Sequence, residues 1–173
     1  ILSFPKSNAG FAVLTKSETR EALLEGLIKI FAFIGSVPTT IWFDQMSSAA
    51  LRTRDEKGIV QVAGFVQRFA THYGFAIKFC NPESDHEKGN VERKVGTIRR
   101  NLFVPEPEIT NLEAYNNDLL EKCQTLNKEN HYIHKIPKEQ IFEEEKVMMV
   151  PMNTAPFDTA KYESRKVNKY GLV

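Results

Sequence analysis

The first 35 residues change from the apolar spacing of strands to that of a helix. Residues 1–14 alternate around a turn-forming segment at 7–10, which predicts a β-hairpin. In residues 15–35 apolar positions recur three and four apart, which predicts a long, buried helix. A capping box at 15–18 is expected to open this helix, and Gly35 to end it.

The next 45 residues predict the rest of a sheet. A β-branched and aromatic run at 39–44 is typical of a strand, and it ends in Asp44. Residues 45–58 show no apolar period and are expected to form a loop. A second amphipathic helix is predicted at 59–73 and a short strand at 75–80. This order of hairpin, helix, strand, helix and strand predicts an α/β fold with a mixed sheet.

A third helix, predicted at 86–102, combines an apolar stripe with many charges. The stripe consists of Val91, Val95, Ile98 and Leu102. Lys88, Glu92 and Arg99 fall together on its flank. A carboxylate between two cations at the edge of a core suits a metal ion and a polyanion. A solvated helix with a weak Lys88–Glu92 pair explains the same spacing, so the pattern alone leaves both interpretations open.

The last 60 residues predict two further helices and a linker. One helix is expected at 110–126, again opened by a capping box, and a short one at 137–145. His131 and His134 have H-x-x-H spacing, but no cysteine or carboxylate pair lies nearby at metal-site spacing, which argues against zinc. After Val147 the prolines and the low apolar density predict a linker that adds nothing to the core.

Charge limits where a polyanion could bind. Lysine and arginine number 23 against 22 aspartate and glutamate, so the formal net charge is only +1 and a basic surface must be local. The best local candidates are Lys88, Arg93, Lys94, Arg99 and Arg100. They would either contact phosphates or form a solvated basic face. Asp85 is expected to cap this helix, and His86 lies close to its start.

Composition also indicates the compartment. Cys80 and Cys123 lie far apart in an otherwise ordinary globular sequence, which favours reduced thiols. No apolar run approaches the roughly 20 residues of a membrane span, and no signal peptide is visible. We therefore expect a soluble, cytoplasmic protein without a membrane partner.

The letters of the third helix carry a family resemblance. Residues 86–96 read H-E-K-G-N-V-E-R-K-V-G, and Phe79-Cys80-Asn81-Pro82 precedes them. This block resembles the last catalytic block of the DDE transposase and retroviral integrase superfamily, where a K-G-x-x-E or Q-G-x-x-E helix follows an N-P loop. It is most similar to IstA-type insertion-sequence transposases, and the resemblance extends from the hairpin to beyond Pro151.

The resemblance implies an RNase H-like mixed sheet flanked by helices, entered from its second strand. It divides the chain into a catalytic core at 1–104, a helical extension at 105–150, and a linker with the start of a small β-barrel-like module at 151–173.

The resemblance also implies a site of three acidic residues. It places the second on Asp44 and the third on Glu92, as catalytic residues and as ligands of two Mg²⁺ or Mn²⁺ ions. No aspartate precedes Asp44, and the first acid of the family lies before the hairpin. We therefore expect the sequence to begin after the strand that carries it; if the natural chain begins at Ile1, catalysis is in doubt.

The function implied by the resemblance is DNA transposition by 3′-end cleavage and strand transfer. The expected partners are transposon and target DNA, further copies of the chain and an AAA+ ATPase helper. Two alternatives stay open: an RNase H-like nuclease that does not join DNA, and a non-catalytic DNA-binding and multimerisation module.

Overall fold

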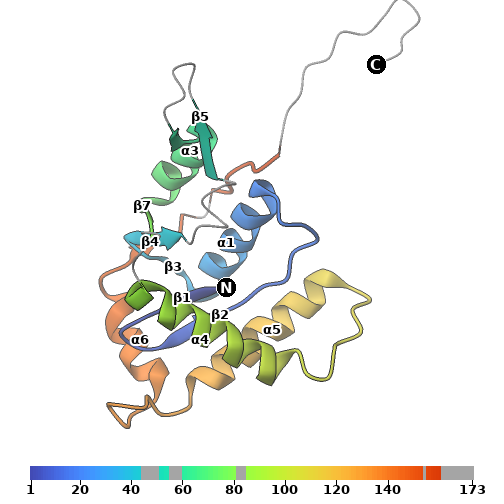
Figure 1. Ribbon diagram of the computed structural model, residues 1–173, viewed down its shortest axis with the longest axis vertical. Coiled ribbons are helices and arrows are strands. Elements are labelled where there is room, and N and C mark those ends of the chain that lie inside the picture. The colour runs from blue at the N-terminus through green and yellow to red at the C-terminus, as the bar shows by residue number, and fades with distance from the viewer. Residues whose placement is uncertain (44–50, 55–59, 81–84, 154, 161–173) are drawn as a thin grey trace, which may run out of the picture.

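The computed structural model describes residues 1–43, 51–54, 60–80, 85–153 and 155–160 of the 173-residue chain (Figure 1). Side chains are described in these ranges except at 52–54, 60 and 85–92. The described residues form five helices: α1 (Arg20–Ile34), α3 (Gly64–Tyr73), α4 (Asp85–Leu102), α5 (Leu112–Asn127) and α6 (Lys138–Lys146). They also form eight short strands: β1 (Leu2–Phe4), β2 (Ala9–Phe11), β3 (Ser36–Val37), β4 (Thr40–Phe43), β5 (Arg52–Arg54), β6 (Val60–Val62), β7 (Ala76–Phe79) and β8 (Val150–Pro151).

The eight strands pair two by two. β1–β2, β3–β8 and β5–β6 are antiparallel pairs, and β4–β7 is a parallel pair. The mixed α/β class predicted from the sequence is confirmed. The described strands do not merge into the single mixed sheet that was expected, and the RNase H-like arrangement stays a prediction.

The predicted hairpin is confirmed, and helix α1 follows it later than expected. Leu2 pairs with Phe11, and the chain turns through Asn8, whose φ is 55°. The prediction that a capping box at 15–18 opens this helix is wrong. The residue that caps α1 is Thr19, whose hydroxyl accepts a hydrogen bond from the Ala22 N–H at 3.3 Å. Capping needs a hydroxyl directly before the first helical residue, and three serine or threonine residues lie close together here.

Left-handed glycines end α1 and α3 as predicted. Gly35 has φ 71° and donates its N–H to the Phe31 carbonyl at 2.8 Å. Gly74 has φ 76° and donates to Ala70 at 2.9 Å. A residue with a Cβ pays a steric penalty in this conformation, so both helix ends could be predicted from the sequence.

The segment before α3 departs from the prediction. Residues 52–54, expected in a loop, form β5, and residues 60–62, expected at the start of a helix, form β6. Val62 pairs with Arg52, and α3 begins only at Gly64. Valines two apart satisfy a strand as well as a helix, and the backbone pairing with β5 decides in favour of the strand.

The core lies between α1, α3 and the β4–β7 pair and continues down to the hairpin. Phe31 of α1 contacts Tyr73 and Phe75, with ring centroids 5.8 and 6.1 Å apart. At the hairpin, Phe4 packs on Phe142 of α6 with a centroid distance of 4.7 Å. The apolar stripes of the helices thus meet in one continuous core.

Two asparagine side chains of α5 form hydrogen bonds with the backbone of the second hairpin strand and of the segment that follows it. Asn116 accepts from the Leu14 N–H at 2.7 Å and donates to its carbonyl at 2.9 Å. Asn127 makes the equivalent two bonds with Gly10, at 3.1 and 3.2 Å. Both side chains are buried. Gly10 lies in β2 and Leu14 in the segment after it. Asn127 therefore closes the edge of β2 that faces away from β1, and Asn116 holds the chain beyond it.

The residues that precede α5 and α6 as caps each differ by one position from the prediction. Asn111, rather than Thr110, caps α5, and its side chain accepts from Glu113 and Ala114 at 2.9 and 3.0 Å. Pro137 directly precedes α6 instead of being its first helical residue. Both positions favour a residue that needs no intrahelical N–H bond.

The segment after Val147 packs on the core, so the expectation that it adds nothing is wrong for its described part. β8 pairs with β3, and Phe157 packs on Phe69 of α3 with ring centroids 5.3 Å apart. The Phe157 N–H donates to the Tyr73 hydroxyl at 3.3 Å. The packing of Phe157 could not be predicted from the sequence, because it is a single apolar residue among polar neighbours and prolines. The domain boundary at 151 stays a prediction.

Candidate functional site

Helix α4 is anchored to the core by its second half. Ile98 is 2% exposed, and Val95 and Leu102 are half-buried, which confirms the predicted apolar stripe at these three positions. Val91 lies in the helix, but its side chain is outside the described set. Asp85 is the first residue of α4, and its role as the capping residue stays a prediction because its side chain is not described. The helix contacts β1 and α5 (Figure 1).

The two predicted acidic residues lie at the limits of the described chain. β4 ends at Phe43, and Asp44 directly after it lies outside the described residues. Glu92 lies in α4, and its side chain is not among those described. Their convergence and their roles as catalytic residues and metal ligands therefore stay predictions.

The backbone nevertheless brings the two relevant chain segments to one edge. β4 and β7 run parallel, Phe43 pairs with Phe79, and the Cys80 N–H donates to the Phe43 carbonyl at 3.0 Å. The carboxyl ends of parallel strands lie at the same edge of a sheet, where ligands bind in open α/β folds. β4 ends at Phe43 and β7 at Phe79, so the two strands that precede Asp44 and the segment before α4 in the sequence end at one edge.

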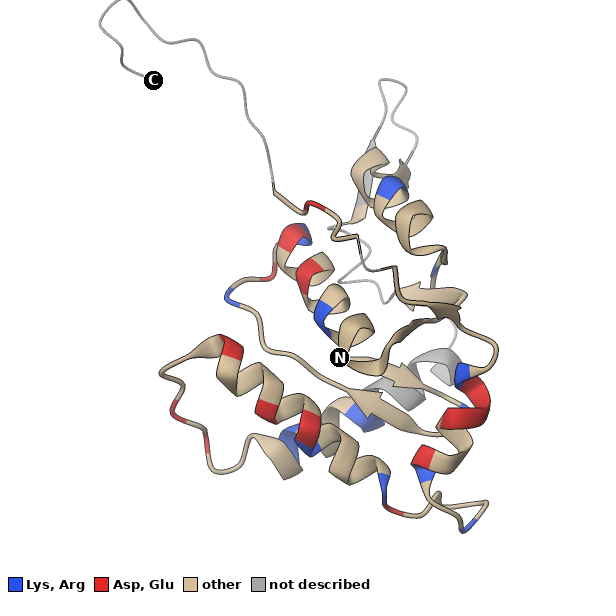
Figure 2. Ribbon diagram, turned by 180° about the vertical axis from the view of Figure 1, so that it is seen from behind, with Lys and Arg blue, Asp and Glu red and all other residues tan. Residues whose placement is uncertain are grey.

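The predicted DNA-binding cations fall into two environments. Arg93, Arg99 and Arg100 are exposed on α4, and the side chain of Lys88 is not described. Figure 2 shows basic residues on the described half of α4 and acidic residues along the neighbouring α5. A polyanion would therefore be attracted to the outer face of α4 and repelled by α5. DNA binding by these residues stays a prediction.

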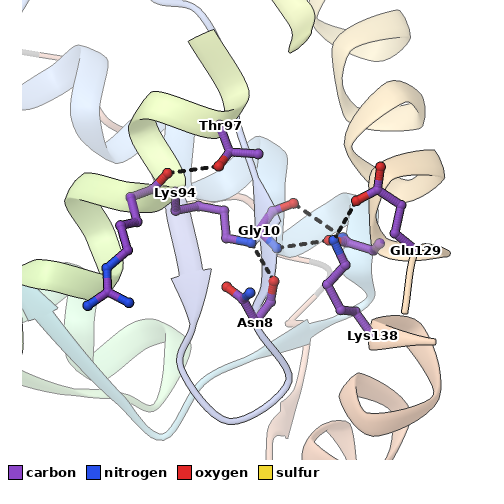
Figure 3. Close-up of polar contacts among 8 residues, drawn as sticks. Asn8, Gly10, Lys94, Thr97, Glu129 and Lys138 are labelled. Atoms are coloured by element: carbon purple, nitrogen blue, oxygen red, sulfur yellow. Dashed lines mark hydrogen bonds and ion pairs between the residues drawn. The ribbon is translucent and has the colours of Figure 1, made fainter. Parts of the chain in front are cut away.

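Lys94 differs from the other four cations. It is 8% exposed, and its ammonium donates to the carbonyl of Asn8 in the hairpin turn (Figure 3). Burial is the main cause, and the nearby Lys138 cation the second, of the lowering of the pKa of Lys94 to about 8. An ammonium enclosed in this way does not suit a phosphate contact. The signal was present in the sequence, because position 94 lies three residues after Val91 and four before Ile98, inside the apolar stripe.

The surroundings of Lys94 were not predicted. A Cβ at Gly10 would lie only 2.7 Å from Cδ of Lys94, so the lysine stem lies directly against the glycine. Asn127 holds the same glycine from α5, and Lys138 of α6 forms an ion pair with Glu129 at 3.0 Å. These contacts join residues that are far apart in the chain, so no local sequence pattern predicts them.

The sequence is similar to those of known insertion-sequence transposases. No protein-family model matches the sequence. The chain is 31% identical, over 94% of its length, to the candidate transposase of insertion sequence element IS5376 from Geobacillus stearothermophilus. It is 28% identical, over 86% of its length, to the transposase of insertion sequence element IS21 from Pseudomonas aeruginosa. The chain is a relative of the insertion-sequence transposases, including the IS21 type.

This transposase relative is shorter than the proteins it matches. It spans 40% of the length of the IS5376 protein and 38% of that of the IS21 transposase. These matches confirm the resemblance to IS21-type insertion-sequence transposases that was read from residues 79–96, and the DDE-type site stays a prediction.

The described part of this transposase relative lacks a ready-made metal site and a membrane-spanning helix. In the ranges that the structure describes, no group of three His, Cys, Asp or Glu side chains is placed to hold a metal ion. No helix in those ranges has the length and apolar character needed to cross a membrane. Of the H-x-x-H pair, the ring of His131 stabilises the loop that contains it. Its Nδ1 accepts hydrogen bonds from the N–H groups of Ile133 and His134 at 3.2 and 3.3 Å.

Proposed function

We propose that this chain forms part of the catalytic core of a DDE-type transposase. The full protein would cleave the 3′ ends of a mobile element with water and join the freed 3′-hydroxyl groups to target DNA. The observation that carries the proposal is the parallel β4–β7 pair, whose strands end at one sheet edge and directly precede Asp44 and the segment before α4 in the sequence. The similarity to insertion-sequence transposases supports the same assignment.

Asp44 and Glu92 would hold the metal ions. Carboxylate oxygens are the hard donors that Mg²⁺ and Mn²⁺ prefer, so this donor set fits these ions. When bound, such a pair of ions activates an attacking oxygen and stabilises the leaving one. The relatives are longer than this chain, so we assign the third carboxylate of the site to a longer protein of which this chain is a part.

The exposed arginines of α4 would hold the DNA backbone. Arg93, Arg99 and Arg100 project from the helix that carries position 92, and at about 100° per residue Lys88 lies on the same side of that helix as Arg99. Contacts of this kind fix the register of the DNA without reading its sequence, and they make affinity fall with salt. We extend the proposal to assembly with further copies and to an ATPase helper, both of which rest on the IstA-type resemblance.

The test uses the full-length protein with the variant Glu92→Gln. Replacing a metal-binding carboxylate by an amide of equal size should reduce cleavage and strand transfer by orders of magnitude while DNA binding persists. Glu121→Gln, at an exposed acid on α5, is the matched control and should retain activity.

The same assay separates the alternatives. Cleavage without any joined product in the unaltered protein would indicate a nuclease. DNA binding without cleavage would indicate a binding module. Normal strand transfer by Glu92→Gln would exclude the assigned role of that residue.

A further inference from the structure

Lys94 connects helix α4 to the turn of the hairpin. Its ammonium donates to the Asn8 carbonyl, and Asn8 holds a positive φ of 55° that turns the backbone at this point. The side chain is buried at the junction of three elements, with the hairpin below it and Glu129 and Lys138 nearby (Figure 3). This side chain therefore adds a polar link between α4 and the hairpin turn to the apolar anchoring by Ile98.

The contact surface on the hairpin is fitted to this lysine. Gly10 leaves open the space that Cγ and Cδ of Lys94 occupy, since a Cβ there would lie 3.1 and 2.7 Å from these atoms. Asn127 fixes the same glycine from the other side through its N–H and carbonyl. Gly10, on which the Lys94 stem rests, is therefore held in place by α5. A shift of α4 would not carry this part of the hairpin with it.

Helical geometry connects this contact to the proposed site. Successive residues of an α-helix are rotated by about 100°, so position 92 lies roughly 160° around α4 from position 94. A contact that holds position 94 against the hairpin therefore fixes the rotation of α4, and with it the place of position 92. A small rotation would displace a ligand at position 92 by an amount that catalysis does not tolerate.

We propose that Lys94 is a positioning residue, which sets the rotation of α4 and thereby places Glu92 for metal binding. The proposal rests on the function proposed above. It assigns Lys94 a role different from that of the exposed arginines on the same helix, since it acts through the hairpin and not on DNA.

The test compares Lys94→Met with Arg99→Met in the full-length protein. Lys94→Met retains most of the stem and removes the ammonium. Strand transfer should fall about tenfold or more, and more Mg²⁺ should be needed for half-maximal cleavage, while DNA affinity and its salt dependence stay unchanged. Arg99→Met should do the opposite, with weaker DNA binding, a salt slope shallower by about one and an unchanged Mg²⁺ requirement.

Two results would overturn the proposal. If Lys94→Met weakens DNA binding with a shallower salt slope, Lys94 is a phosphate contact. If it lowers only the melting temperature and leaves the Mg²⁺ requirement unchanged, it is a structural residue without a positioning role. Glu92→Gln is measured beside them: if that variant is active, the proposed function has failed and not merely the role of Lys94.

A second variant reaches the same contact from the hairpin. Gly10→Ala should displace the lysine stem and raise the Mg²⁺ requirement in the same way, which also covers the case in which Lys94→Met does not fold. Combining Gly10→Ala with Lys94→Ala should add little to the effect of either change, because both remove one contact. Additive effects on the Mg²⁺ requirement would overturn the proposal.

Discussion

Asn127 on α5 binds Gly10 on β2 through both backbone groups of the glycine. Its Oδ1 accepts from the N–H at 3.1 Å, and its Nδ2 donates to the carbonyl at 3.2 Å. The amide thus replaces the neighbouring strand that this edge of β2 would otherwise need. The same glycine supports Lys94 of α4, so two helices depend on one buried residue of the hairpin.

We expect Asn127→Ala to destabilise the chain by about 3 kcal/mol, because it leaves a buried donor and a buried acceptor without partners. Urea denaturation of the chain measures this. Asn116→Ala is the matched control, with the same two bonds to the less buried Leu14, and should cost about 1 kcal/mol. Equal, small losses for both variants would show that water replaces the amide at Gly10.

We expect truncation after Pro151 to lower the melting temperature, contrary to the linker predicted from the sequence. It would remove Phe157 from Phe65 and Phe69, at centroid distances of 5.4 and 5.3 Å. Phe157→Ala alone should cost about 2 kcal/mol, less than a fully buried phenylalanine, because the ring is half-buried. Met148→Ala, at a side chain that is 77% exposed, should change little. An unchanged melting temperature after truncation would restore the linker interpretation.

Stability should also fall at mildly acidic pH because of His131. Burial lowers the pKa of His131 below its ordinary value of 6.5, and the charges of His134 and Lys138 lower it further. The folded state therefore favours the neutral ring, whose Nδ1 accepts two backbone N–H groups. Its contribution is complete above pH 6.5 and is lost as the pH falls through that value towards the lowered pKa.

Thermal melts between pH 7.5 and 5 test this dependence. His131→Gln should reduce the decline in melting temperature over this range, while His134→Gln, at the exposed histidine of the pair, should leave it largely in place. The assignment would be wrong if the decline were the same in His131→Gln as in the unaltered chain.

The elements that the sequence predicted correctly are those fixed by local chemistry. Gly35 and Gly74 end their helices because few other residues adopt a positive φ cheaply. Ile98 and Leu102 face the core because their spacing matches the helical period. In each case the neighbours along the chain suffice to determine the outcome.

The errors come from contacts between distant segments. Val60 and Val62 form a strand because β5 pairs with them, which no helical or strand period reveals. The spacing of Lys94 indicates its burial, but not its partner, because the carbonyl that accepts a hydrogen bond from its ammonium lies in a turn 86 residues earlier. The assignments of Asp44 and Glu92 came from the family motif and not from the periodicity. What the structure adds to them is the parallel pairing of β4 with β7.

The final prediction uses Trp42 as a reporter for the proposed metal site. It is the single tryptophan of the chain and lies two residues before Asp44 on β4. The residue is 51% exposed, and the ammonium of Lys78 lies 5.0 Å from the centroid of its ring. Mn²⁺ is paramagnetic and quenches nearby fluorophores. Binding at Asp44 should therefore reduce the emission of Trp42 in a saturable manner, and Mg²⁺ should reverse the loss by competition.

Asp44→Asn should abolish the saturable part of this quenching, because the anionic ligand is gone. Lys78→Met should change the initial emission through the lost cation–π contact but retain the response to Mn²⁺, so it separates a local change around the ring from a change in metal binding. Quenching that rises linearly with Mn²⁺, and to the same extent in Asp44→Asn, would mean only collisions with ions in solution. In that case Asp44 would not hold a metal ion in this chain.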